Sequence, residues 1–203
     1  MPKLKVAVLI SGRGSNLKAL LDACDTPNFP AEIVHVISNK RTAKGLRYAE
    51  EYKVPYEVIS HKDFEKRLDF DMTLHERISK SGAEFVCLAG FMRVLSAKFV
   101  ELWQDRLINI HPSLLPSFKG VETHKQALDA GVKYHGCTVH FVRPDVDSGP
   151  IIVQEVVPVL DDDTEETLSA RALEKEHIAY RRALRTIADK KYKIEGNKVI
   201  TWG

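Results

Sequence analysis

The stretch LINIHPSLLP, residues 107–116, is where an apolar strand ends in polar side chains. Positions i and i+2 of a strand lie on the same face, so Asn109 and His111 are expected to point together beyond the strand end. Pro112 has no backbone N–H for a sheet ladder, so strand pairing is expected to stop there. A carboxamide donor beside a titratable base suits chemistry at a carbonyl group. The alternative is an Asn and a His bound only by neighbouring backbone.

Before this stretch, apolar runs with strand character alternate with segments of helical spacing. The expected elements are strand 6–10, helix 15–23, strand 33–37, helix 43–51, strand 56–60, helix 63–80, strand 85–88, helix 96–102 and strand 107–111. This alternation predicts parallel strands joined by right-handed crossovers, with helices on both faces of the sheet. The first half is therefore expected to be Rossmann-like.

After Pro112 the pattern changes to a loop, a short helix over 124–130 and two long strands over 134–142 and 151–159. Asp163 and Glu166 have the spacing of a capping box, which predicts a long helix to about residue 189, and residues 192–202 favour a hairpin. No repeat or linker interrupts the chain. We predict one α/β domain over 1–203, with a Rossmann-like, mostly parallel sheet, helices on both faces and later antiparallel strands that extend it.

The composition excludes several classes of protein. A chain of 203 residues with 44% hydrophobic content can bury a large core, and its net charge of +2 argues against nucleic acid as a partner. Cys24, Cys87 and Cys137 are odd in number and widely spaced, which is typical of reduced thiols. The apolar runs are too short to span a membrane, and no signal peptide precedes the first strand. We expect a cytoplasmic protein.

A glycine-rich turn, Ser11-Gly12-Arg13-Gly14-Ser15-Asn16, joins the first strand to the first helix. Backbone N–H groups at such a helix start can hold a phosphate. Leu17 occupies the last glycine position of the G-x-G-x-x-G pattern, and no carboxylate follows the second strand to bind a ribose, so NAD is disfavoured. The alternative is a tight turn that binds nothing.

The segment Arg143 to Pro150 joins the two late strands and carries Asp145 and Asp147. If this loop folds over the end of the Asn109 strand, one of its carboxylates would favour the charged imidazole of His111 and raise its pKa. His111 would then serve as a proton donor, and Asn109 could bind a developing oxyanion. The sequence does not decide between the two aspartates.

The remaining histidines do not predict a metal site. His135 and Cys137 share one strand face, whereas His140 points the opposite way, so a common metal is not expected. His75-Glu76 lacks the second histidine of the zinc-protease pattern. We predict no metal.

Several segments together resemble the phosphoribosylglycinamide formyltransferases, a family of folate-dependent enzymes of purine biosynthesis. The resemblance covers essentially the whole chain. The segments are 8–12 with Gly14-Ser15-Asn16, Leu88 to Arg93, Asn109 to Pro116, Val139 to Val142, and Asp147 with Gly149-Pro150.

This resemblance implies transfer of the formyl group of 10-formyltetrahydrofolate to the amine of 5-phosphoribosyl glycinamide. It implies that His111 transfers protons, that Asp147 raises the pKa of His111 and that Asn109 stabilises the oxyanion. It assigns Gly14, Ser15, Asn16 and Glu176 to the glycinamide substrate. The residues implied for folate are Arg67, Met92, Arg93, Val94, Leu95, Asn109, Arg143, Pro144, Asp145, Val146 and Asp147.

Some of these residues have plainer alternatives. Leu88 and Met92 are equally compatible with ordinary core, and Glu176 with a solvated helix residue. Leu173 stands where relatives place a lysine or glutamine near the phosphate, and Arg13 or Lys175 could compensate. The expected partners are small-molecule substrates, without nucleic acid or membrane, and the expected assembly is a monomer or homodimer.

Two other functions compete with this interpretation. A methionyl-tRNA formyltransferase or a formyl-folate hydrolase would use the same Asn, His and Asp set, but each carries an additional domain. A noncatalytic nucleotide-binding module would use His111 and Asp147 only for structure.

Overall fold

The computed structural model describes residues 2–202 of the chain. The strands in this range are β1 (Leu4–Ile10), β2 (Ala31–Ser38), β3 (Tyr56–Val58), β4 (Phe85–Leu88), β5 (Leu107–His111), β6 (Tyr134–Phe141), β7 (Ile151–Pro158), β8 (Tyr192–Glu195) and β9 (Lys198–Thr201). The helices are α1 (Ser15–Asp25), α2 (Leu46–Glu51), α3 (Arg67–Lys80), α4 (Ala97–Leu102), α5 (Thr123–Asp129) and α6 (Glu165–Ala188), with a 3₁₀ turn at His61–Asp63.

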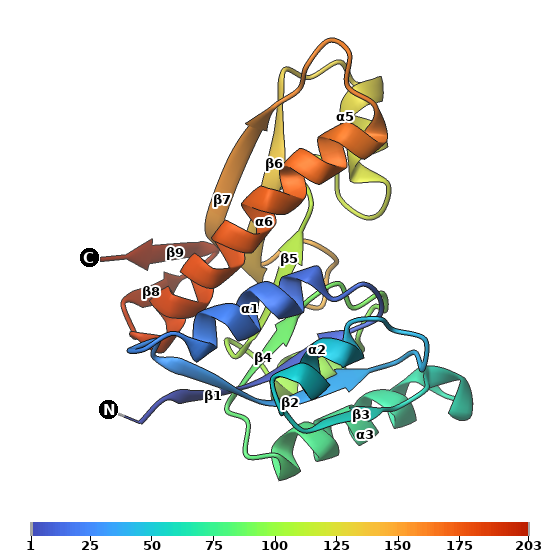
Figure 1. The fold of residues 1–203 in the computed structure, drawn as a ribbon, viewed down its shortest axis with the longest axis vertical. Coiled ribbons are helices and arrows are strands. Elements are labelled where there is room, and N and C mark those ends of the chain that lie inside the picture. The colour runs from blue at the N-terminus through green and yellow to red at the C-terminus, as the bar shows by residue number, and fades with distance from the viewer. Residues whose placement is uncertain (1, 203) are drawn as a thin grey trace.

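All the strands within residues 2–202 form one sheet in the order β3-β2-β1-β4-β5-β6-β7-β9-β8. The strands from β3 to β5 are parallel, and β6 and β7 then continue the sheet in antiparallel pairing. Figure 1 shows β6, β7 and the upper part of α6 extending beyond the parallel half, with α5 beside them. The predicted fold class is confirmed, including the hairpin of β8 and β9.

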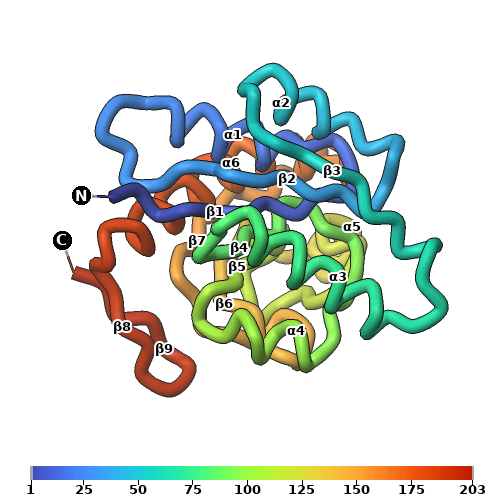
Figure 2. The backbone as a smooth tube through the Cα atoms, turned by 90° about the horizontal axis from the view of Figure 1, so that it is seen from below, coloured from blue at the N-terminus to red at the C-terminus, as the bar shows by residue number. Residues whose placement is uncertain are grey.

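Helices cover both faces of the parallel half. Figure 2 shows α1 and α2 on one side of the sheet, together with α6, and α3 and α4 on the other. The continuous apolar run of β1 fits this position, since Val6 and Val8 pack in the core cluster under α1 and α6, whereas Ala7 and Leu9 pack in the cluster under α3 and α4. A strand buried on both faces has no need of a polar alternation.

The long helix α6 begins one residue later than the predicted capping box implies. The capping residue is Thr164, whose side chain accepts a hydrogen bond from the backbone of Thr167, while the Thr167 side chain caps the backbone of Thr164 in return. The prediction that Asp163 and Glu166 form the box was wrong. The carboxylate of Asp163 instead binds Arg171, with a shortest distance of 2.7 Å.

Two other helices begin later than their spacing predicts. The segment from residue 43 enters helix only at Leu46, because the backbone first makes a turn in which Ala43 N–H donates to Lys40. The segment from residue 63 enters helix only at Arg67, because His61–Asp63 form a separate 3₁₀ turn and Phe64 and Lys66 are extended. Apolar residues keep a helical spacing through both turns. The prediction from periodicity alone therefore placed the starts of both helices too early.

The direction of the strand order reverses between β1 and β4. The chain after β1 leads to β2 on one side, whereas β4 lies on the other side of β1. Ligands of open α/β sheets bind at such a point. Among residues 2–202, no helix combines the length and the apolar character needed to cross a membrane.

Candidate active site

Asn109 and His111 lie at the carboxyl end of β5, where the sequence places them. The ladder with β6 ends at the pair His111 and Thr138, directly before Pro112. His111 is buried and Asn109 is partly buried. The predicted polar strand end is thus present.

The loop between β6 and β7 returns to this strand end and brings Asp147 to His111. Asp147 Oδ2 lies 3.5 Å from Nδ1 of His111, and both side chains are almost entirely buried. Asp147 has a φ of 50°, a left-handed conformation that Asp tolerates better than most residues. Asp145 is exposed. The structure therefore resolves the choice that the sequence left open: Asp147 is the carboxylate beside the imidazole.

The loop that follows β5 covers this pair. The N–H at Nε2 of His111 donates to the carbonyl oxygen of Phe118 over 2.9 Å, and the backbone N–H of Gly120 donates to Asp147 Oδ2 over 2.9 Å. Both ring nitrogens of His111 thus face oxygen atoms that can only accept. A substrate that binds His111 at Nε2 must displace Phe118.

His140 is a member of this cluster that the sequence prediction missed. It lies on β6 directly opposite Asn109, and its Nε2 is 3.4 Å from Asn109 Nδ2 and 3.9 Å from Asp147 Oδ1. Burial lowers the pKa of His140. The neighbouring His111 and Lys119 also lower this pKa, whereas Asp147 raises it. The strand pairing that brings His140 here was not readable from local pattern.

The glycine turn after β1 is built around Gly14, which caps α1 with a φ of 77°. A Cβ atom added to Gly14 would stand 2.4 Å from the Cα of Gly45. Asn16 is buried in the first turn of α1, and Ser15 is partly exposed beside it. Close backbone packing against Gly45 is therefore enough to require glycine at position 14. The N–H groups in the first turn of α1 remain available to an anion.

The variant Gly14→Ala is expected to lower the free energy of unfolding by about 2 kcal/mol or more. A left-handed alanine costs roughly 1–2 kcal/mol, and the contact with Gly45 adds overpacking. Urea unfolding measures the loss. Gly12→Ala is the control, because its added Cβ meets nothing within 4 Å. Equal stability of the two variants would contradict the packing role of Gly14.

Glu176 lies on α6 and reaches α1. Only 8% of Glu176 is exposed, so it is not a solvated helix residue. Its Oε2 accepts a hydrogen bond of 2.7 Å from Asn16 Nδ2. Burial raises the pKa of Glu176, partly offset by the hydrogen bond from Asn16 and the charge of Arg13. In the described part of the chain, Oδ1 of Asn16 is buried without a hydrogen-bond partner, which leaves an acceptor beside this carboxylate.

The variant Glu176→Gln is expected to be more stable than the parent at neutral pH. Because the folded state raises the pKa of Glu176, it binds the proton more tightly than the unfolded state, and the ionised carboxylate costs stability above that pKa. The gain should shrink as the pH falls toward the ordinary carboxyl range. Thermal unfolding at a series of pH values measures it.

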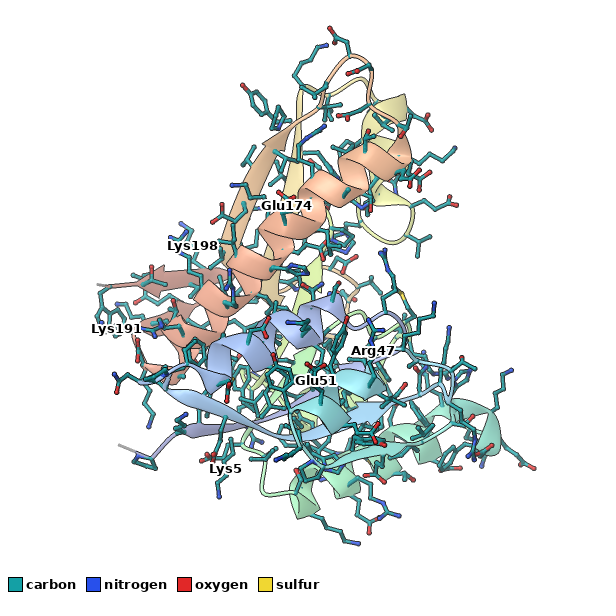
Figure 3. All side chains as sticks on the ribbon, viewed as in Figure 1. Lys5, Arg47, Glu51, Glu174, Lys191 and Lys198 are labelled. Carbon is teal, nitrogen blue, oxygen red and sulfur yellow. The ribbon has the colours of Figure 1, made fainter. Side chains whose placement is uncertain are left out.

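Glu174→Gln is the matched control, because Glu174 is exposed on the same helix (Figure 3) and should show no such pH-dependent gain. A Glu176→Gln protein that is less stable than the parent at neutral pH would contradict the burial argument.

The segment after β4 contains both exposed and buried residues. Met92 is 70% exposed and is not core, whereas Leu88 and Leu95 are buried core residues. The backbone N–H of Met92 donates to Ser11 Oγ, so it is not free to bind a ligand. Arg93 stacks on the ring of Phe70 at 5.4 Å.

The other residues implied for folate lie in separate segments of the chain. Val94 and Val146 are exposed and apolar, with exposed Pro144 beside Val146. Arg67 is exposed at the start of α3, and Arg143 pairs with Asp105 at 2.6 Å.

Within residues 2–202, no three His, Cys, Asp or Glu side chains are grouped to hold a metal ion. His135 contacts His124 instead, with 3.0 Å between Nε2 and Nδ1. Burial lowers the pKa of both histidines, that of His135 to about 4.

Comparisons with known proteins show which proteins this chain is similar to. Over 200 residues the chain is 50% identical to the trifunctional purine biosynthetic protein adenosine-3 of Gallus gallus. This match covers 98% of this chain and 20% of that protein. The chain thus spans about a fifth of the length of such relatives. It is 41% identical over 194 residues to the phosphoribosylglycinamide formyltransferase of Escherichia coli (strain K12), covering 96% of this chain and 92% of that protein.

A solved structure has nearly the same fold. The glycinamide ribonucleotide transformylase 1 from Symbiobacterium toebii superposes with a TM-score of 0.97 at 43% sequence identity, covering 99% of this chain and 95% of that one. The family model described as formyl transferase matches residues 4–184. Because this match spans most of the chain, the protein belongs to the formyl transferase family.

Proposed function

We propose that this protein transfers the formyl group of 10-formyltetrahydrofolate to the amine of 5-phosphoribosyl glycinamide, a step of purine biosynthesis. In this reaction the amine nitrogen bonds to the formyl carbon, the bond from that carbon to the folate nitrogen breaks, and a proton moves from the amine to the folate nitrogen. The bound folate would supply the formyl group, and its nitrogen would leave with the proton. The protein residues must stabilise charge and move the proton.

The observation that carries the proposal is the meeting of Asn109, His111 and Asp147 at one sheet edge. The Asp147 carboxylate lies 3.5 Å from Nδ1 of His111 and the Phe118 carbonyl lies at Nε2, so the imidazole is held between two acceptors in a position to serve in proton transfer. Asn109 supplies an amide donor for the negative charge that develops on the formyl oxygen. Asp147 holds the imidazole in place.

The acceptor substrate would bind at the turn between β1 and α1. The N-terminus of α1 after Gly14, with Ser15 beside it, would hold the phosphate through backbone N–H groups. Asn16 and the buried carboxylate of Glu176 would bind the glycinamide amine. The positive charge of Arg13 lies close enough to Glu176 to lower the pKa of that carboxyl group. Arg13 can therefore supply the positive charge near the phosphate that Leu173 cannot provide.

The folate fits the exposed apolar side chains after β4 and in the loop before β7. Met92, Val94 and Val146 offer the ring an apolar surface at this edge. The guanidinium of Arg93 lies over the ring of Phe70, where it can meet a carboxylate of the ligand. We propose that Leu95 contacts the folate through its backbone, because its side chain is buried in the core.

The purified protein tests this proposal directly. Formyl-folate absorbance should fall only when phosphoribosyl glycinamide is added. A fall without the acceptor would indicate a hydrolase, and no fall in either case would favour a noncatalytic binding module. Both outcomes would refute the transferase.

We also propose that the chain works as one formyltransferase domain in the cytoplasm, as a monomer or homodimer on small-molecule substrates. Strands from Leu4 to Thr201 share one sheet, which supports a single unit. Cys24, Cys87 and Cys137 are free thiols, which suits a reducing compartment.

A further inference from the structure

We infer that His140 is a positioning residue for formyl transfer: it accepts a hydrogen bond from the side-chain amide of Asn109 and so fixes which end of that amide faces the formyl oxygen. This inference rests on the function proposed above. It concerns a residue outside the Asn109, His111 and Asp147 set.

The position of His140 follows from the register of β5 and β6. Asn109 and His140 are direct partners in the antiparallel ladder, so their side chains are neighbours on one face. Nε2 of His140 lies 3.4 Å from Nδ2 of Asn109, and only 2% of His140 is exposed. The pairing of β6 with β7 shifts register between Val139 and His140, and such irregularities commonly redirect a side chain beside a site.

The hydrogen bonds of His140 decide its tautomer. Its Nδ1 lies 2.9 Å from the carbonyl oxygen of Phe141, which can only accept, so Nδ1 carries the hydrogen. In the neutral ring Nε2 is then an acceptor. Asn109 must present its NH₂ group to Nε2, because its carbonyl oxygen would put two acceptors face to face.

This orientation is the useful one for the proposed reaction. His140 Nε2 lies 3.4 Å from Asn109 Nδ2 and 3.9 Å from Asp147 Oδ1, so this ring nitrogen faces both the amide and the carboxylate. One amide hydrogen is held by His140, and the second remains for the formyl oxygen. A reversed amide would instead turn lone pairs toward the developing negative charge.

The neutral state of His140 also leaves the Asp147 carboxylate to interact with His111. A protonated His140 would donate from Nε2, attract the Asp147 carboxylate and prefer the carbonyl oxygen of Asn109. Burial, which lowers the pKa of His140, opposes that state. The two histidines on either side of Asp147 therefore have different tasks: one holds the amide and the other moves the proton.

Two substitutions separate this role from simple packing. We expect His140→Ala to lower kcat by about 10- to 10²-fold, less than the loss of an oxyanion donor itself, with both KM values unchanged. His140→Gln should recover most of the rate, because its side-chain oxygen can accept from Asn109 at the same place. A glutamine variant as slow as the alanine variant would overturn the inference.

A double-mutant cycle with Asn109→Ala identifies the partner. If His140 acts through Asn109, His140→Ala should cost little further rate in the Asn109→Ala protein. The same fold-loss in both backgrounds would overturn the inference. Nitrogen-15 NMR of the ring provides a readout without activity: we expect neutral His140 with the hydrogen on Nδ1, and a hydrogen on Nε2 would contradict the hydrogen-bond argument. Absence of acceptor-dependent transfer by the parent protein would instead refute the proposed function.

Discussion

Replacing Asp147 with asparagine is expected to lower kcat by about 10²- to 10⁴-fold, the range for loss of positioned acid–base catalysis. The change removes the negative charge 3.5 Å from Nδ1 of His111 and leaves the size of the side chain almost unchanged. Asparagine also tolerates the left-handed backbone of position 147 and can still accept from Gly120. The fold should therefore be retained, so the loss reports on the charge.

Steady-state kinetics across the neutral pH range measure this effect, with circular dichroism to confirm folding. Asp145→Asn is the matched control, because Asp145 lies in the same loop but is exposed. We expect it to keep nearly the parent rate. Near-normal turnover of Asp147→Asn throughout that range would reject the role of the carboxylate.

Replacing His111 with alanine is expected to remove most activity, again by about 10²- to 10⁴-fold, while folate binding is retained. His111 is the group that faces both Asp147 and the loop carbonyl of Phe118, so no other side chain of the cluster is placed to exchange the proton in the same way. Met92, Val94 and Val146, which we propose to bind the folate, are exposed, whereas His111 is buried.

Calorimetric titration with the folate and kinetics with both substrates separate these two properties. His111→Asn fills more of the space than alanine and should show the same loss of rate, which distinguishes proton transfer from packing. A fully active His111→Ala protein would move the proton donor to another residue.

The sequence predicted the parallel half of the fold because its signals are local. The apolar runs of β1 and β4 are buried on both faces, and alternation with helices determines their parallel pairing. Helix starts were less accurate, since the turns before Leu46 and Arg67 keep an apolar spacing. The capping box at Thr164 was missed because Asp163 and Thr164 are both good capping residues, and the side chain of Asp163 instead contacts Arg171 and Thr167 of α6.

The site shows the same division between local and long-range information. Asn109 and His111 could be paired from a spacing of two in one strand, and the structure keeps them together. The choice of Asp147 over Asp145 depends on how a loop closes over a distant strand. His140 depends on the register of two strands joined by a long connection, and Glu176 on the contact of α6 with α1. Such long-range pairing leaves no signal in local periodicity.

Transfer of an isotope-labelled formyl group tests the central claim most directly. The purified protein would be given labelled 10-formyltetrahydrofolate and phosphoribosyl glycinamide, and the products would be separated and identified by mass spectrometry. We predict that the label appears on the glycinamide amine, with tetrahydrofolate as the other product. Label found in free formate, or retained in the folate, would contradict the assignment.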